Sequence, residues 1–115
     1  MQSVVEMPEF IRCAKKLGIS DNERENIINI IASNPDIGDE MVGTGGMRKL
    51  RVASPGKGKS GGYRVITFFS GSDIPVFLIT IYAKNQKDNL TDKEKKILKS
   101  LSANIVEFYK GEQDE

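Results

Sequence analysis

The chain has 115 residues, 38% hydrophobic and 29% charged, and a formal net charge of +1 at pH 7. These values predict one soluble globular domain over 1–115 and argue against a disordered chain. No apolar run approaches the roughly 20 residues that cross a bilayer, and the N-terminus lacks the basic start of a signal peptide. The single cysteine, Cys13, has no partner for an internal disulfide, so we expect a core role for it in a reduced, cytoplasmic protein.

The first 40 residues predict a short strand followed by a helical hairpin. Residues 2–7 are β-branched at their centre and predict an edge strand. Pro8 suits the first position of a helix. Ser20 and Glu23 have the spacing of a capping box, in which each side chain bonds the other residue's backbone N–H. A second helix should therefore begin there and end before Pro35.

The rest of the chain predicts three more strands and a long helix. Residues 36–46 show no period and indicate a loop. Strands are expected in three places: 47–53, 63–70 and 76–83. The last two are apolar on both faces and should be central, with a short turn between them. Thr91 begins a second capping box that opens a long apolar-striped helix, and the acidic tail over 111–115 should fray. The order β-α-α-β-β-β-α predicts a single α+β domain.

Positive charge is concentrated in the middle of the chain. The stretch from Gly43 to Arg64 holds six basic residues, no acidic residue and seven of the eleven glycines. Such a stretch predicts a patch for an anionic partner, with a solvated lysine-rich loop as the alternative. Lys49 and Arg51 should share one face of their strand. If the strands pair antiparallel in sequence order, Arg64 should meet two residues at the end of the last strand: Tyr82 and Lys84.

Several familiar kinds of site are poorly supported. Residues 53–60, ASPGKGKS, fit a loose P-loop pattern, but the strand-forming run YRVITFF follows where a P-loop needs a helix N-terminus. The chain has no histidine and its acidic residues are scattered, so no metal site and no cofactor are expected. A serine or cysteine nucleophile would lack its activating histidine. The chemistry that remains is carried by cations.

A longer pattern resembles a known family. The run RKLRV, a glycine-rich turn, GYRVI and then FLITIYAKN resemble the RelE/ParE superfamily of toxins from bacterial toxin–antitoxin pairs. The string GTGG-x-RK-x-R-x-A-x-x-GKGK-x-GG-x-R is most similar to the HigB-type branch. The resemblance covers nearly the whole chain and implies a twisted antiparallel sheet with helices packed on it. It also implies a toxin that an antitoxin neutralises and that cuts messenger RNA in the A site of a translating ribosome.

The resemblance assigns roles residue by residue. The family's basic site residues match four positions: Lys49, Arg51, Arg64 and Lys84. Leu90 lies near the position where some members have a tyrosine that stacks on an RNA base, and Tyr82 is the substitute we expect. The C-terminal histidine that serves other members as acid or base has no counterpart here. Three further basic residues are expected to bind RNA of the message or the ribosome: Arg48, Lys57 and Lys59.

The mechanism implied is cleavage by the RNA's own 2′-hydroxyl, without metal. Arg51 and Arg64 would stabilise the charged phosphorane, although Arg64 could instead be a plain surface residue of its strand. Lys49 or Lys84 would carry a proton or clamp a phosphate. Tyr82 would orient a base or the leaving group, or would merely pack.

Two other functions fit the same residues. A gyrase-inhibiting toxin of the same superfamily would bind its target without catalysis, and the basic cluster would be dispensable. A plain nucleic-acid-binding module would lose affinity uniformly as its charges are removed. The apolar stripes of the first and last helices suit core packing and an antitoxin groove equally well.

Overall fold

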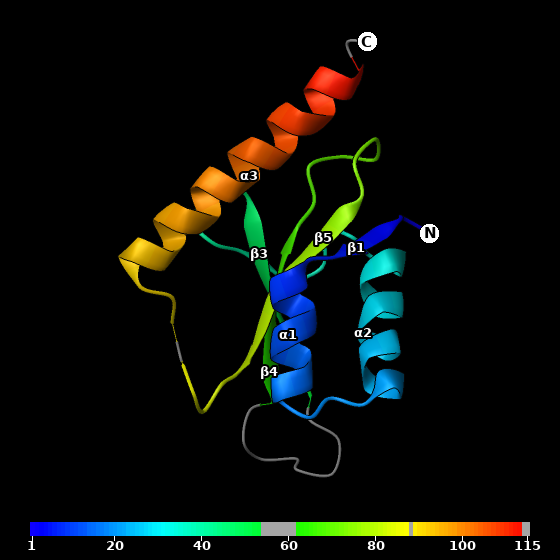
Figure 1. Cartoon of the computed structure of the whole chain (residues 1–115), viewed down its shortest axis with the longest axis vertical. Coiled ribbons are helices and arrows are strands. Elements are labelled where there is room, and N and C mark those ends of the chain that lie inside the picture. Colours follow the sequence, from blue (N-terminus) through cyan, green and yellow to red (C-terminus); the bar gives the residue numbers. More distant parts are fainter. Residues whose placement is uncertain (54–61, 88, 114–115) are drawn as a thin grey trace.

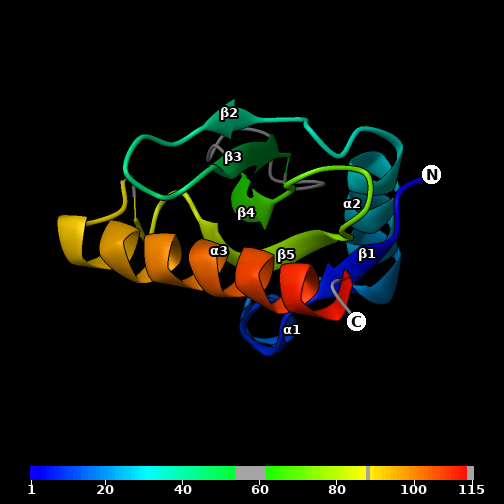
Figure 2. The same cartoon turned by 90° about the horizontal axis from the view of Figure 1, so that it is seen from above.

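The fold is a twisted five-stranded sheet with helices on both faces (Figures 1 and 2). The computed structural model describes residues 1–53, 62–87 and 89–113. Its elements are β1 (Val4–Glu6), α1 (Pro8–Lys16), α2 (Asp21–Ser33), β2 (Asp39–Glu40), β3 (Met47–Val52), β4 (Tyr63–Phe68), β5 (Val76–Ala83) and α3 (Asp92–Gln113). This is the α+β class that the sequence predicts.

The strands lie in the order β1-β5-β4-β3-β2. The predicted antiparallel pairing in sequence order is confirmed for β3, β4 and β5, and the last two are central. β1 lies at an edge, as predicted, but it pairs parallel to β5, so the sheet is not antiparallel throughout. Parallel neighbours need no tight turn between them, and the whole chain from α1 to β4 separates these two strands.

One strand was not predicted. Within the expected loop, Asp39 and Glu40 form β2, which pairs antiparallel with Lys49 and Arg48 of β3 respectively. Two residues are too few for an alternating pattern to be recognised. Their pairing becomes favourable only beside β3, where each acidic residue lies opposite a basic one.

Two of the helices begin at the predicted capping boxes. At α2, the backbone N–H of Glu23 donates to Ser20 Oγ at 3.1 Å, and Ser20 N–H donates to Glu23 Oε1 at 3.2 Å. At α3, Glu94 N–H donates to Thr91 Oγ1 at 3.1 Å and Thr91 N–H donates to Glu94 Oε1 at 2.8 Å. Each helix start thus has two of its otherwise unpaired donors satisfied.

The last helix differs from its prediction in length and in its buried side. It continues to Gln113 and so takes in the first residues of the acidic tail. Its apolar residues are divided between the core and the surface: Leu98 and Ile105 are buried, whereas Ile97 is 59% and Phe108 is 60% exposed. No helix among the described residues is both long and apolar enough to cross a membrane.

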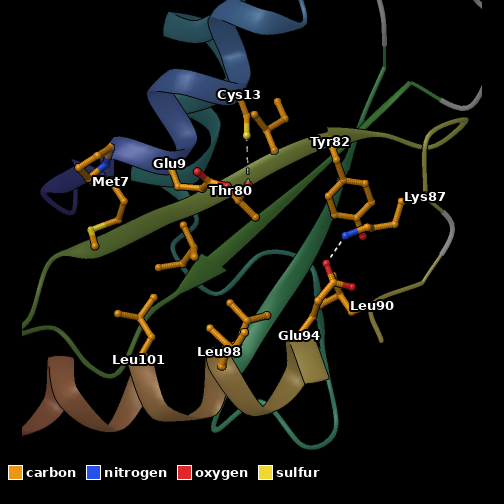
Figure 3. A pocket seen from close by; sticks show the side chains of 14 residues that line it. Met7, Glu9, Cys13, Thr80, Tyr82, Lys87, Leu90, Glu94, Leu98 and Leu101 are labelled. Atoms are coloured by element: carbon orange, nitrogen blue, oxygen red, sulfur yellow. Dashed lines mark hydrogen bonds and ion pairs between the residues drawn. The ribbon is translucent and has the colours of Figure 1, made fainter. Parts of the chain in front are cut away.

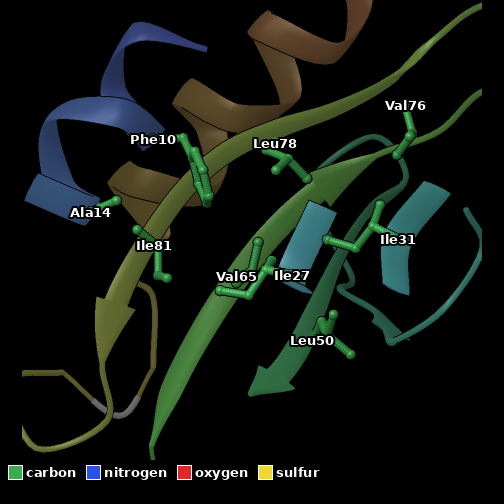
Figure 4. Packing of buried hydrophobic residues seen from close by; sticks show 9 residues of the cluster. All are labelled: Phe10, Ala14, Ile27, Ile31, Leu50, Val65, Val76, Leu78 and Ile81. Atoms are coloured by element: carbon green, nitrogen blue, oxygen red, sulfur yellow. The ribbon is translucent and has the colours of Figure 1, made fainter. Parts of the chain in front are cut away.

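The core has one layer on each face of the sheet. α1 and α2 cover the first face, where nine buried residues form a cluster (Figure 4): Phe10, Ala14, Ile27, Ile31, Leu50, Val65, Val76, Leu78 and Ile81. α3 covers the second face with another cluster: Met47, Ile66, Phe68, Phe77, Ile79, Leu98 and Ile105. Neighbours along a strand point to opposite faces and so enter opposite layers. Cys13 is half-buried against the first cluster, in keeping with the predicted core role.

The loop before β3 fixes α3 in place. Ser102 Oγ donates to the carbonyl oxygen of Thr44 at 3.2 Å. Gly45 has φ +73°, and a Cβ added there would lie 2.2 Å from Ser102 Oγ. Only glycine suits this backbone conformation and this close approach. Gly45, near the beginning of the basic stretch, therefore serves the packing of α3 across the beginning of β3.

Candidate functional site

Three of the predicted side chains stand in one row across the sheet. In the register of the strands, Arg51 of β3 lies opposite Arg64 of β4, and Arg64 lies opposite Tyr82 of β5. Directly paired residues point to the same face, with Cβ atoms about 4.5–5.5 Å apart. The predicted meeting of Arg64 with Tyr82 at one end of the sheet is thereby confirmed. This row belongs to the face that α3 covers further along the strands.

The two arginines of the row differ in their exposure. Arg51 is exposed, whereas Arg64 is only 5% exposed. The Nη1 of Arg64 donates to the carbonyl oxygen of Tyr63 at 3.2 Å. A buried guanidinium needs polar partners to offset its lost hydration. The alternative reading of Arg64 as a plain surface residue is therefore wrong.

Lys49 lies on the same face, two residues before Arg51. It is half-buried, with Ile66 opposite it on one side and Asp39 of β2 on the other. The register thus brings a carboxylate beside a candidate proton carrier. Sequence reasoning missed Asp39, because nothing in the sequence shows that Asp39 and Glu40 form a strand.

Lys84 reaches the same end of the sheet from the turn after β5. Its backbone N–H donates at 3.1 Å to the carbonyl oxygen of Gly62, which directly precedes β4. The next turn is closed by Lys87, whose N–H donates to the carbonyl oxygen of Lys84 at 3.2 Å. The Lys84 side chain is exposed. Lys49 and Lys84 therefore flank the strand that carries Arg64.

Tyr82 has a half-buried ring and a buried hydroxyl. Among the described residues, that hydroxyl oxygen has no hydrogen-bond partner. Burial raises the pKa of the Tyr82 phenol, while the positive charge of Arg64 acts in the opposite direction and the negative charge of Glu94 adds to the increase. The phenol is therefore protonated at neutral pH and can donate a hydrogen bond.

A cavity of about 730 Å³ lies beside Tyr82, between α1, β5 and α3 (Figure 3). Its walls are mostly apolar and include Met7, Leu98 and Leu101. Tyr82 and the ion pair between Lys87 and Glu94 lie together at one end of it. The hydrogen bond from Lys87 is the main reason that the pKa of Glu94 lies below its usual value. Tyr82 thus belongs both to the wall of the cavity and to the row that it forms with Arg51 and Arg64, which we call the cationic row.

Some predicted residues do not lie beside the cationic row. Arg48 lies on the opposite face of the sheet, where its Nη1 donates to the carbonyl oxygen of Gly38 at 3.1 Å. Leu90 packs at the edge of the second core cluster. Lys57 and Lys59 lie outside the described residues. Over the described ranges, no three His, Cys, Asp or Glu side chains gather in a way that could hold a metal ion.

Comparison with known proteins identifies one family. The model of the RelE toxin of the RelE/RelB toxin–antitoxin system matches residues 3–114, which is nearly the whole chain. Among solved structures, the chain is similar to a double-mutant form of the E. coli toxin RelE in the free state, with a TM-score of 0.51 and 16% sequence identity. That match covers 76% of this chain and 87% of the other. At this identity the likeness is one of fold.

Proposed function

Because the chain belongs to the RelE toxin family of toxin–antitoxin systems, we propose that it is a ribosome-dependent endoribonuclease that cuts messenger RNA in the A site. The observation that carries this proposal is the row of Arg51, Arg64 and Tyr82 at one end of the sheet. Two guanidinium groups on one face suit a phosphate whose negative charge grows during the reaction. The string around the basic stretch supports placement in the HigB-type branch. A cytoplasmic location and a cognate antitoxin belong to the same proposal.

The reaction we propose is an internal transesterification. The 2′-oxygen of the RNA forms a bond to the adjacent phosphorus, and the bond from phosphorus to the 5′-oxygen breaks. The 2′-hydroxyl proton passes to a base, and the departing 5′-oxygen receives a proton. The products are a 2′,3′-cyclic phosphate and a 5′-hydroxyl, and no metal is needed to balance the step.

The arrangement of the strands suits this geometry. Arg64 is held within the sheet and would bind the equatorial phosphate oxygens, with Arg51 approaching from the solvent side. Attacking and leaving oxygens lie roughly in line on opposite sides of phosphorus. Lys49 of β3 and Lys84 in the turn after β5 flank the strand that carries Arg64, so one can accept a proton while the other donates. The protonated phenol of Tyr82 is a second donor for the leaving oxygen, and its ring can orient a base.

Mapping of messenger RNA 5′ ends in cells tests the proposal. The strains express wild type, Arg64→Ala, Arg64→Lys or the control Arg12→Ala, whose exposed side chain forms an ion pair with Glu9. Cuts within codons should appear with wild type and Arg12→Ala and should fall at least about 100-fold with Arg64→Ala, because one transition-state donor is lost. Arg64→Lys should recover part of the activity, because it keeps the charge but loses the fork.

Two results would contradict the nuclease. The first is an absence of codon-specific cuts with wild type, and DNA damage in its place would favour a gyrase-inhibiting toxin. The second is full activity of Arg64→Ala. Because Arg64 is buried, circular dichroism on the purified variants must show that they fold.

A further inference from the structure

One ion pair ties the turn after β5 to the first turn of α3. Lys87 Nζ contacts Glu94 Oε2, and each side chain is about one-third exposed, at 35% and 34% (Figure 3). The ion pair of Arg12 with Glu9 is far more open, at 60% and 51%. Partial burial makes the inner pair less subject to screening by salt. It is also fixed at its base, because Glu94 accepts the N–H of Thr91 in the capping box.

The same lysine touches the ring of Tyr82. Lys87 Nζ lies 5.8 Å from the ring centroid, within the range of a cation–π contact. The Tyr82 hydroxyl has no hydrogen-bond partner among the described residues, so no such bond sets the direction of the ring. The orientation of the ring is therefore set by packing and by the contact with Lys87.

Lys87 also closes the turn that carries Lys84. Its backbone N–H donates to the carbonyl oxygen of Lys84 at 3.2 Å, and the N–H of Lys84 in turn donates to the carbonyl oxygen of Gly62, just before β4. One residue therefore connects α3 with both Tyr82 and the turn of Lys84. A lysine already paired with a carboxylate is a poor ligand for RNA phosphate, which argues for an indirect role.

We propose that Lys87, held by Glu94, is a positioning residue that fixes the Tyr82 ring and the Lys84 turn for RNA cleavage. The inference rests on the nuclease function proposed above. Lys87 acts through Tyr82 and Lys84 and does not touch the reacting phosphate. Glu94 contributes by holding the ammonium group over the ring.

Cleavage kinetics on programmed ribosomes test the role in the reaction. Lys87→Met keeps the length of the side chain without its charge and should lower kcat about tenfold with KM within about twofold, because the cation–π contact with Tyr82 and the ion pair that ties the turn to α3 are lost. Lys87→Arg should recover most of kcat. Glu94→Gln keeps the capping box but not the ion pair and should lie between wild type and Lys87→Met. Arg12→Met, which removes the exposed ion pair, should match wild type.

Tyrosine ring NMR tests the positioning independently of cleavage. With three tyrosines in the chain, the resonances assign readily by substitution. The Tyr82 ring signals should shift in Lys87→Met and Glu94→Gln and should stay in place in Arg12→Met. An active wild type with an equally active Lys87→Met overturns the role, and so do unchanged Tyr82 signals. An inactive wild type overturns the nuclease function instead, while the ring signals still decide whether Lys87 orders Tyr82.

Discussion

The sheet face beneath α3 has an apolar end and a cationic end, although the same strands build both. Along β3 the residues on this face are Met47, Lys49 and Arg51, and their exposure rises from fully buried through half-buried to exposed. Along β4 the change from apolar to charged runs from Phe68 through Ile66 to Arg64, in the reverse direction of the chain, but all three side chains are buried. What differs between the ends is the chemistry of the side chains and, along β3, also their exposure.

The difference teaches how stability and chemistry are divided within one face. At the apolar end, Gly45 lets Ser102 approach, and the side chains pack without charge. At the other end, two arginines lie directly opposite each other, which by itself is unfavourable in a sheet. A protein retains such an arrangement where function requires it and the rest of the fold offsets the cost. The apolar end should therefore govern stability and the cationic end should govern activity.

The largest expected effect is at the apolar end. Met47 is fully buried between the sheet and α3, so Met47→Ala should leave a cavity and lower the free energy of unfolding by about 2–5 kcal/mol. Urea denaturation measures this, and cleavage per folded molecule should stay near wild type. Val42→Ala is the control, because Val42 is 89% exposed and should change stability by less than about 0.5 kcal/mol. A loss below about 1 kcal/mol for Met47→Ala would show that this end is not the stabilising one.

At the cationic end a substitution should lower cleavage and leave stability almost unchanged. Arg51→Ala removes an exposed side chain, so the free energy of unfolding should change by less than about 0.5 kcal/mol or rise slightly as repulsion with Arg64 is relieved. Cleavage should fall about 100-fold, because a donor to the phosphorane is lost. Ribosome-based cleavage and urea denaturation on the same sample check both statements, with Arg12→Ala as the control. A marked loss of stability with intact cleavage would remove the division between the two ends.

The sequence predicted the cationic row because the signals for it are local. Alternation placed Lys49 and Arg51 on one face, and antiparallel pairing in sequence order placed Arg64 beside Tyr82. The same alternation assigns Arg48 to the opposite face, with Leu50, so the signal that separates it from the cluster was already present. Asp39 carried no such signal, because β2 exists only through its pairing with β3.

Other features depend on how α3 crosses the sheet. Helical spacing marks an apolar stripe but does not say which side of it faces inward. The structure buries Ser102, whose hydroxyl bonds Thr44 and Lys99, and leaves Ile97 and Phe108 at the surface. Long-range contacts of this kind follow from a crossing angle that no local pattern contains.

The smallest expected effect lies at Tyr82, in the row at the cationic end, and it concerns the pH dependence of stability. Burial raises the pKa of this phenol above its ordinary value of 10.0, so the folded state favours the neutral form. Its contribution to stability is complete below pH 10 and is lost as the pH rises through the raised pKa. Between pH 8 and pH 11, wild type should therefore lose more stability than Tyr82→Phe, as urea denaturation at each pH would show. Tyr109→Phe, which keeps Tyr82, should follow wild type. Equal losses of stability in wild type and Tyr82→Phe would mean that the Tyr82 hydroxyl is in contact with solvent. The cationic end would then extend further beneath α3 than the row of Arg51, Arg64 and Tyr82.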